Sequence, residues 1–204
     1  VAVLTTGQVS ALTTGSICPL STSQVSALTT AQVRVLSTAN IVALSTTQVA
    51  SLSSTQLNAL GSTVIQALET GDLQALTTTQ TQALGATQLN KLSRDQVQAL
   101  TSTQLQALSS TQLNAMGSQQ INNLTSAQVS ALTTDQVATL KTDHIASLNV
   151  ATLNALTTDQ IAALTTTQLV KLSNANITAF NTAQVAALTT EQVANMTAAQ
   201  LSSL

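Results

Sequence analysis

The chain has 204 residues, a formal net charge of -2, 44% hydrophobic residues and only 6% charged residues. This composition is too apolar for a disordered chain, and it is dominated by Thr, Ser, Ala, Leu, Gln and Val to a degree that ordinary enzymes do not show. Basic residues are too few for a nucleic-acid surface, and no apolar run approaches the roughly 18 residues of a membrane-spanning helix. We therefore expect no nucleic-acid partner and no membrane insertion.

The first 20 residues contain two features that bear on processing and redox chemistry. The start Val1-Ala2-Val3-Leu4 has no basic region and no long apolar region, so we expect no signal peptide in this stretch. Cys18 is the only cysteine, which excludes a disulfide within the chain. An inert small side chain is the favoured interpretation of Cys18, with an intermolecular bridge or a reactive thiol as alternatives.

An eight-residue repeat without insertion or deletion runs from Leu4 to Leu204. Leu occupies every eighth position of this frame, and a second apolar column of Val, Ile and Leu lies five residues after the first, from Val9 to Leu201, with Thr81 as its polar exception. The consensus is Leu-Thr-Thr-x-Gln-Val-x-Ala. We predict one uninterrupted repeat solenoid over residues 1-204, as a segment of a longer chain or filament. The residues that replace Leu in its column are Met116, Phe180 and Met196.

Three backbone conformations compete for this period. In a continuous α-helix, eight residues advance about 800°, so the Leu column would drift by about 80° per repeat and form no stripe. In a continuous strand, the Leu and Val columns would face opposite sides. A β-solenoid requires a turn in every repeat, and Gly, Asn or Asp turn signals do not recur in each unit. It stays open as the alternative to a solenoid of separate short helices.

Helix-start signals favour the short helices. In the segment 28-33, Thr29 and Gln32 form a capping box, while Leu28 and Val33 occupy the hydrophobic staple positions. Five of the seven carboxylates lie two residues after a cap position, where they favour the helix dipole. The fold class we predict is therefore all-α, a solenoid with one very short helix per repeat, in which stacking on neighbours supplies the stability. These carboxylates are Asp95, Asp135, Asp143, Asp159 and Glu191. The residues that replace Ser or Thr at caps are Gly61, Gly85, Gly117, Asn149 and Asn181, with Glu69 and Lys141 as poor caps.

Two resemblances follow from these motifs. The segment Leu188-Thr189-Thr190-Glu191-Gln192-Val193 resembles the helix-opening Leu-Thr-Pro-Glu-Gln-Val of TAL-effector repeats, but it shares only the cap and the staple with them. Over all 204 residues the chain resembles the Leu-Thr-Thr-x-Gln-Val-x-Ala-Leu arrays of very long secreted or surface proteins of proteobacteria, which are described as adhesin-like. This second resemblance implies an extracellular fibrous role and carries no functional residues with it.

The few chemically active side chains do not form a recognisable site. His144 is the only histidine, and its place in the capping-box Gln column, beside Lys141 and Asp143, indicates a substituted N3 residue. Glu69 and Asp72 are interpreted as solvated charges at a helix start. One histidine cannot complete a triad with the many hydroxyls, and no Cys or His cluster provides metal ligands. We expect no catalytic residue, no cofactor and no metal site, and hence no enzyme.

The leading functional hypothesis is a structural extracellular repeat protein, either a fibre protomer or the spacer of a surface adhesin that associates with itself into fibres. The alternative is a Thr-rich surface that binds ice or glycan, because two columns of Thr and Ser would form a hydroxyl lattice if they lay on one flat outer face. Three Asn-x-Thr sequons could also carry glycan, although they are expected by chance in so Thr-rich a chain. These sequons begin at Asn123, Asn176 and Asn195.

Overall fold

The computed structural model describes all residues from Val1 to Leu204, and its regular structure consists of 25 short helices without a strand. Each helix has four to six residues, and successive helices begin eight residues apart throughout the chain, as at Thr22, Thr30 and Thr38. The prediction of an all-α solenoid with one helix per repeat is confirmed. The β-solenoid alternative is wrong.

The chain divides into two compact units, Val1-Ala107 and Leu108-Leu204, which are described separately. The helices of the first unit are α1 (Thr6–Ser10), α2 (Thr14–Ile17), α3 (Thr22–Ser26), α4 (Thr30–Arg34), α5 (Thr38–Val42), α6 (Thr46–Ala50), α7 (Ser54–Ala59), α8 (Ser62–Ile65), α9 (Thr70–Ala75), α10 (Thr78–Gln82), α11 (Ala86–Leu89), α12 (Arg94–Ala99) and α13 (Ser102–Ala107). The helices of the second unit are α14 (Ser110–Ala115), α15 (Ser118–Asn122), α16 (Ser126–Ala131), α17 (Thr134–Thr139), α18 (Thr142–Ala146), α19 (Val150–Asn154), α20 (Thr158–Ala163), α21 (Thr166–Lys171), α22 (Asn174–Thr178), α23 (Thr182–Ala186), α24 (Thr190–Asn195) and α25 (Ala198–Leu201).

The link between helices needs no left-handed residue. At the end of α21, Leu172 is extended, with φ -66° and ψ 138°, and the next residue, Ser173, is the extended N-cap of α22. No residue of the chain has positive φ. Two extended residues are therefore enough to redirect the chain, which explains why Gly and Asn turn signals do not recur in each repeat.

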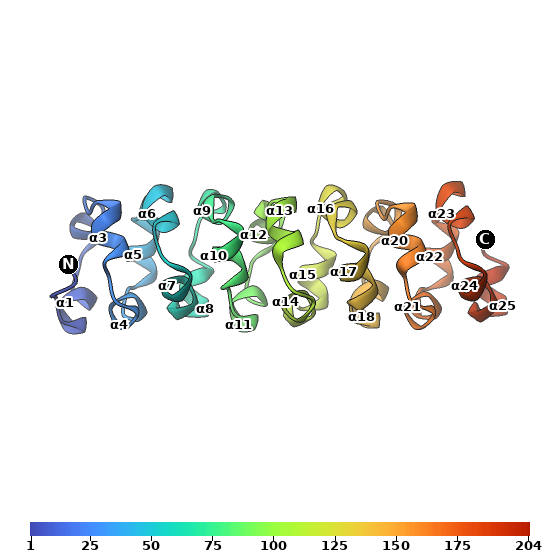
Figure 1. Cartoon of the computed structure of the whole chain (residues 1–204), viewed down its shortest axis with the longest axis horizontal. Coiled ribbons are helices and arrows are strands. Elements are labelled where there is room, and N and C mark those ends of the chain that lie inside the picture. The colour runs from blue at the N-terminus through green and yellow to red at the C-terminus, as the bar shows by residue number, and fades with distance from the viewer. The chain divides into compact units, whose positions relative to one another are not determined.

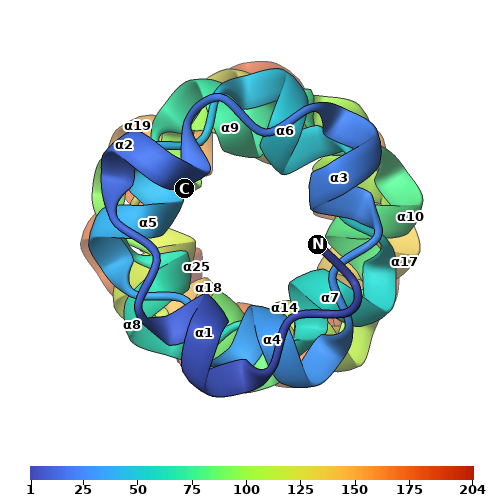
Figure 2. The same ribbon diagram turned by 90° about the vertical axis from the view of Figure 1, so that its left-hand side faces the viewer.

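Within each unit, helices pack against those three places away along the chain. In the first unit α1 packs against α4, α3 against α6 and α6 against α9, and in the second α18 packs against α21. Seen end-on, α1, α2 and α3 follow one another around a ring, and α4 returns beside α1 (Figure 2). In the side view, α3, α6 and α9 lie along one edge of their unit (Figure 1). The chain of each unit therefore winds around an axis as a superhelix of short helices.

The two apolar columns form the core of this winding. Val97 and Leu100 are 0% and 2% exposed in the first unit, and Val137 and Leu140 are 0% and 5% exposed in the second. Thr81, the polar exception, is fully buried, and its hydroxyl donates to the Thr77 carbonyl at 3.0 Å. That bond satisfies the one hydroxyl that the Val column takes into the core.

Candidate functional site

The Gln column is buried and links successive turns of the winding. Gln160 is 1% exposed, and its Oε1 accepts the N–H of the cap residue Thr157 at 2.8 Å. Its Nε2 lies 3.0 Å from the carbonyl oxygen of Val129 and 2.6 Å from that of Leu132, and it donates to both. One amide therefore closes the start of its own helix and the end of a helix in the preceding turn.

The first unit has the same arrangement. Gln96 is 3% exposed, its Oε1 accepts the Ser93 N–H at 3.0 Å, and its Nε2 donates to the Leu68 carbonyl at 2.8 Å. The bond from Gln96 to Leu68 and the bond from Gln160 to Leu132 each span 28 residues, which are three and a half repeats. Other glutamines that make both bonds are Gln32, Gln48, Gln56, Gln80, Gln88, Gln104, Gln168, Gln184, Gln192 and Gln200.

This glutamine ladder solves a problem that short helices create. A helix of six residues leaves nearly all its first N–H and last C=O groups without partners inside the helix. The cap hydroxyl takes one N–H, as Thr157 Oγ1 does for Gln160 N–H at 3.2 Å, and the N–H of Leu164 closes on Ile161 O. The Gln amide then accepts the N–H of the cap residue and donates to carbonyls at the end of a helix in the preceding turn, so its second contact exists only beside another turn.

Sequence reasoning assigned Gln to the capping box and missed its second contact. The capping boxes themselves are confirmed, for example at Thr29 with Gln32 and at Thr101 with Gln104. One signal was available in the sequence, because Glu also satisfies a capping box yet never occurs in this column. The Gln amide accepts with Oε1 and donates with Nε2, whereas an ionised Glu carboxylate can only accept.

His144 occupies a Gln position, as predicted. It is 4% exposed and lies at N3 of α18, whose N-cap is Lys141. Its ring has a hydrogen bond with the backbone of Met116, 28 residues earlier, which is the bond that a Gln Nε2 would make. Nδ1 is buried without any partner. The pKa of His144 is lowered by burial and by Lys141, while Asp143 and the Met116 bond oppose that shift.

Asparagines of the preceding turn replace the missing cap acceptor near His144. The Lys141 N–H donates to Asn114 Oδ1 at 2.8 Å, and the Lys141 ammonium donates to the Asn114 carbonyl at 2.8 Å. One repeat later, where Thr152 stands in the Gln column, the Asn149 N–H donates to Asn122 Oδ1 at 3.0 Å. Both asparagines lie 27 residues before the N–H that they accept.

The prediction of two solvated charges at Glu69 and Asp72 is wrong for Asp72. Glu69 is exposed, but Asp72 is only 3% exposed, because it stands in the Gln column and therefore lies inside the winding. Its Oδ2 accepts the Glu69 N–H at 3.1 Å. Asp72 has thus kept the capping function of the column, while a carboxylate cannot donate to the preceding turn.

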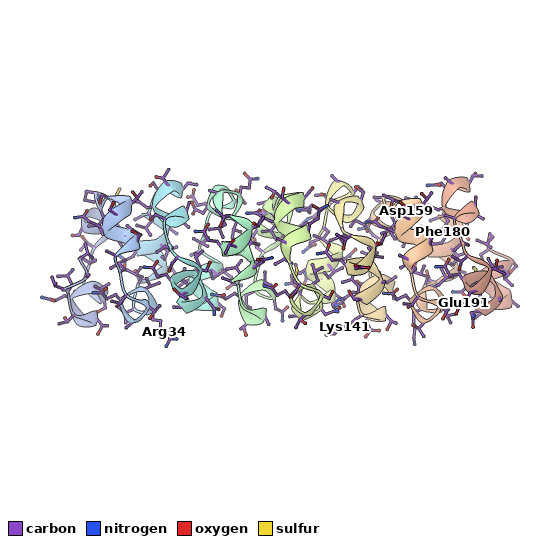
Figure 3. All side chains as sticks on the ribbon, in the orientation of Figure 1. Arg34, Lys141, Asp159, Phe180 and Glu191 are labelled. Carbon is purple, nitrogen blue, oxygen red and sulfur yellow. The ribbon has the colours of Figure 1, made fainter.

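The remaining candidates lie on the surface or in caps. Cys18 is exposed. The five first-turn carboxylates lie where they were predicted, at the starts of α12, α17, α18, α20 and α24. Of the sequon asparagines, Asn176 is buried and donates to Leu148 O, whereas Asn195 is exposed. Arg34 and Lys141 point outward from their units (Figure 3).

The hydroxyl columns follow the winding. Cap and N1 residues such as Thr157 and Thr158 are exposed, and each successive pair belongs to the next helix around the ring (Figure 2). The second unit also has a shallow hollow of about 600 Å³ lined by Thr165, Thr166, Thr189, Thr190 and Glu191, among others.

No group of three or more His, Cys, Asp or Glu side chains is arranged to hold a metal ion. None of the helices combines the length and the apolar character needed to cross a membrane.

The fold and the glutamine ladder define an α-solenoid repeat protein. The ALTTAQ repeat model matches the chain in overlapping stretches, and the chain belongs to this repeat family. The matched residues are 1–38, 30–62, 65–102, 97–126, 110–142, 123–150, 137–174 and 167–198. A comparison with curated protein sequences finds no match.

Proposed function

We propose that this chain is a structural spacer, a load-bearing segment of an extracellular or surface-attached fibre or adhesin, and not an enzyme. The observation that carries the proposal is the glutamine ladder, because it repeats one turn-to-turn connection without reserving any side chain for chemistry. The only histidine is buried within that ladder. Each turn added to such an array lengthens it by the same set of contacts.

Mechanical extension tests the spacer. The 204-residue chain, held by its ends in an optical trap, should unravel in steps of about one turn or less, because each turn is held only by its neighbours. A turn of three repeats, about 24 residues, releases roughly 80 Å when extended, out of about 700 Å for the whole chain. Release of the full length in a single rupture, as in a cooperative globular domain, would contradict the proposal.

The extracellular location is supported by the resemblance to secreted and surface arrays. An antibody raised against the chain should stain intact source cells or their medium. Staining that appears only after permeabilisation, with a cytoplasmic protein as the control, would place the chain inside the cell and contradict this part of the proposal.

Self-association is supported by the surface that one turn of the winding presents to the next. Gln8 and Gln24, which have no preceding turn in the structure, are exposed, whereas Gln32, whose Nε2 donates to Leu4 O at 2.7 Å, is buried. A further turn, from a preceding repeat or from a second copy, would cover them in the same way. Low charge leaves little repulsion between copies, and Ala, Thr and Gln would supply the lateral contacts. Sedimentation over a wide concentration range should show association, and a monomer throughout would contradict it.

Glycan contact is a second candidate, favoured by the Thr-lined hollow that includes Thr165, Thr189 and Glu191. Hydroxyls and one carboxylate are suited to sugar hydroxyls. Neutral oligosaccharides titrated into labelled protein should shift the amide signals of Thr189 and Thr190. Unchanged spectra at millimolar sugar would exclude this candidate.

A further inference from the structure

The α18 repeat is held to its neighbours differently from the repeats around it. Gln136 in α17 donates to Leu108 O at 2.8 Å, and Gln160 in α20 donates to Leu132 O at 2.6 Å. Between them stand His144 and Thr152, so two successive repeats of the second unit lack the amide. Thr152 uses its hydroxyl within its own repeat, where it donates to the Asn149 carbonyl at 2.9 Å.

The imidazole makes one of the two connections of a glutamine. Because Nδ1 has no partner, the ring nitrogen that donates to the Met116 carbonyl is Nε2. The cap N–H that Nδ1 could have accepted is already donated to Asn114 Oδ1. Nδ1 is therefore an unprotonated acceptor enclosed in the interior, and a proton added there would create a buried cation with no acceptor for its N–H.

The charged groups around His144 are few. Its own repeat contains Lys141 and Asp143, α15 packs against it without a charged residue, and α21 packs against it with Lys171 as its only charge. The preceding helix, α17, contains Asp135. Asp143 is exposed to solvent, so it gives a buried imidazolium little stabilisation, whereas burial and Lys141 both lower the pKa.

We propose that the α18 repeat is an acid-sensitive seam of the solenoid: protonation of His144 in mildly acidic solution loosens this repeat from the turns on either side before any glutamine-bridged repeat opens. Gln136 and Gln160 bound the stretch without the amide on its two sides, and within that stretch only the repeat 141-148 contains a histidine. It would allow a spacer to yield at a defined point when its surroundings become acidic.

The direction of the pH dependence follows from linkage. The folded repeat binds the proton more weakly than the open repeat, in which His144 titrates near its ordinary pKa of 6.5. Stability is therefore complete above that pH and falls as the pH decreases below it, until the pH reaches the lowered folded pKa. Within this window the opening constant rises up to tenfold per pH unit.

Because His144 is the only histidine, its imidazole signals in NMR are unambiguous. We expect a pKa below 6.5 and nitrogen shifts of a neutral ring protonated at Nε2. A pKa at or above 6.5, or a ring protonated at Nδ1, would overturn the proposal.

Hydrogen exchange tests the seam itself. After correction for intrinsic exchange rates, the amides of Ile145 and Leu148 should open several-fold more at pH 5 than at pH 7.5, while those of Leu169 and Leu172 in α21 should not. The variant His144→Gln restores the consensus amide and should abolish this difference without disturbing the fold. Equal acid loosening in α21, or an unchanged acid response in H144Q, would overturn the proposal.

Discussion

Two interruptions of the glutamine ladder, one in each unit, retain opposite halves of the connection. Asp72 in α9 accepts the N–H of its cap residue and has no hydrogen to donate to the preceding turn. His144 in α18 donates to the preceding turn at Met116 and leaves its other nitrogen without a partner. One side chain preserves the helix start and the other preserves the contact between turns.

The comparison shows why the column needs an amide instead of any polar group. Asn40, although one methylene shorter than Gln, accepts the Ser37 N–H at 3.1 Å and donates to Leu12 O at 2.9 Å. Asn176 makes the equivalent pair of bonds at 3.2 and 3.4 Å. The pairing of a donor with an acceptor therefore matters more than side-chain length.

The largest expected effect comes from the apolar columns, which continue through both interruptions without change. Leu132 is 6% exposed, and Leu132→Ala should lower the local free energy of opening by about 2 to 5 kcal/mol because it leaves a cavity. Native-state hydrogen exchange of α16 and α20 measures this. Val150→Ala is the control, since Val150 is 47% exposed and should change stability by less than about 0.5 kcal/mol. Equal effects of the two variants would show that the Leu column is not the core.

Removing both hydrogen bonds of one Gln amide should lower the local free energy of opening by nearly as much. Gln160→Leu leaves the Leu132 carbonyl as a buried acceptor without this donor, which costs roughly 1 to 3 kcal/mol, and it also removes the acceptor of the N–H of the exposed Thr157, while the added apolar surface offsets part of the loss. We expect a net loss of about 1 to 3 kcal/mol in exchange measurements of α16 and α20.

Gln160→Asn is the matched control, because Asn40 and Asn176 show that the shorter amide can make both bonds. It should cost about 1 kcal/mol or less. A loss as large as that of the Leu variant would mean that the fit of the longer side chain, and not its paired hydrogen bonds, holds the turns together.

The capping boxes and the apolar columns could be predicted from the sequence, but the way in which the chain winds could not. The pairing of Thr29 with Gln32 predicts a helix start, and apolar residues that recur at every eighth position predict a repeat fold. How many repeats make a turn depends on which helices stack on one another, here those three places apart, and no pattern within eight residues gives that number. The burial of Asp72 was missed for the same reason, since only the winding shows that the N3 side chain faces inward.

A smaller effect is expected at the cap. Thr157→Ala removes the hydroxyl that accepts the Gln160 N–H but leaves both bonds of the Gln160 amide in place. The loss should be about 1 kcal/mol, and Thr157→Gly should lose only a few tenths, consistent with Gly85, whose N–H donates to Gln88 Oε1 at 2.7 Å. Exchange of the α20 amides measures both variants. A cap variant as damaging as Gln160→Leu would assign the main stabilisation to the helix start.

The smallest expected effect is a gain in stability, from a substitution that restores an amide at position 72. Asp72→Asn keeps an oxygen for the Glu69 N–H and adds an amide hydrogen for the Leu44 carbonyl, the residue 28 positions earlier, as Asn40 does for Leu12. One added turn-to-turn hydrogen bond should stabilise α9 by about 0.5 to 1 kcal/mol, measured by exchange of the Leu73 and Leu76 amides. Asp95→Asn, an exposed first-turn carboxylate, is the control, and it should lose a few tenths of a kcal/mol through the helix dipole. A loss of stability in α9 for Asp72→Asn, similar to the loss in α12 for the control, would contradict this prediction. It would mean that the Asp72 carboxylate stabilises α9 through its charge, and that the hydrogen bond to the cap N–H is sufficient there without a bond to the preceding turn.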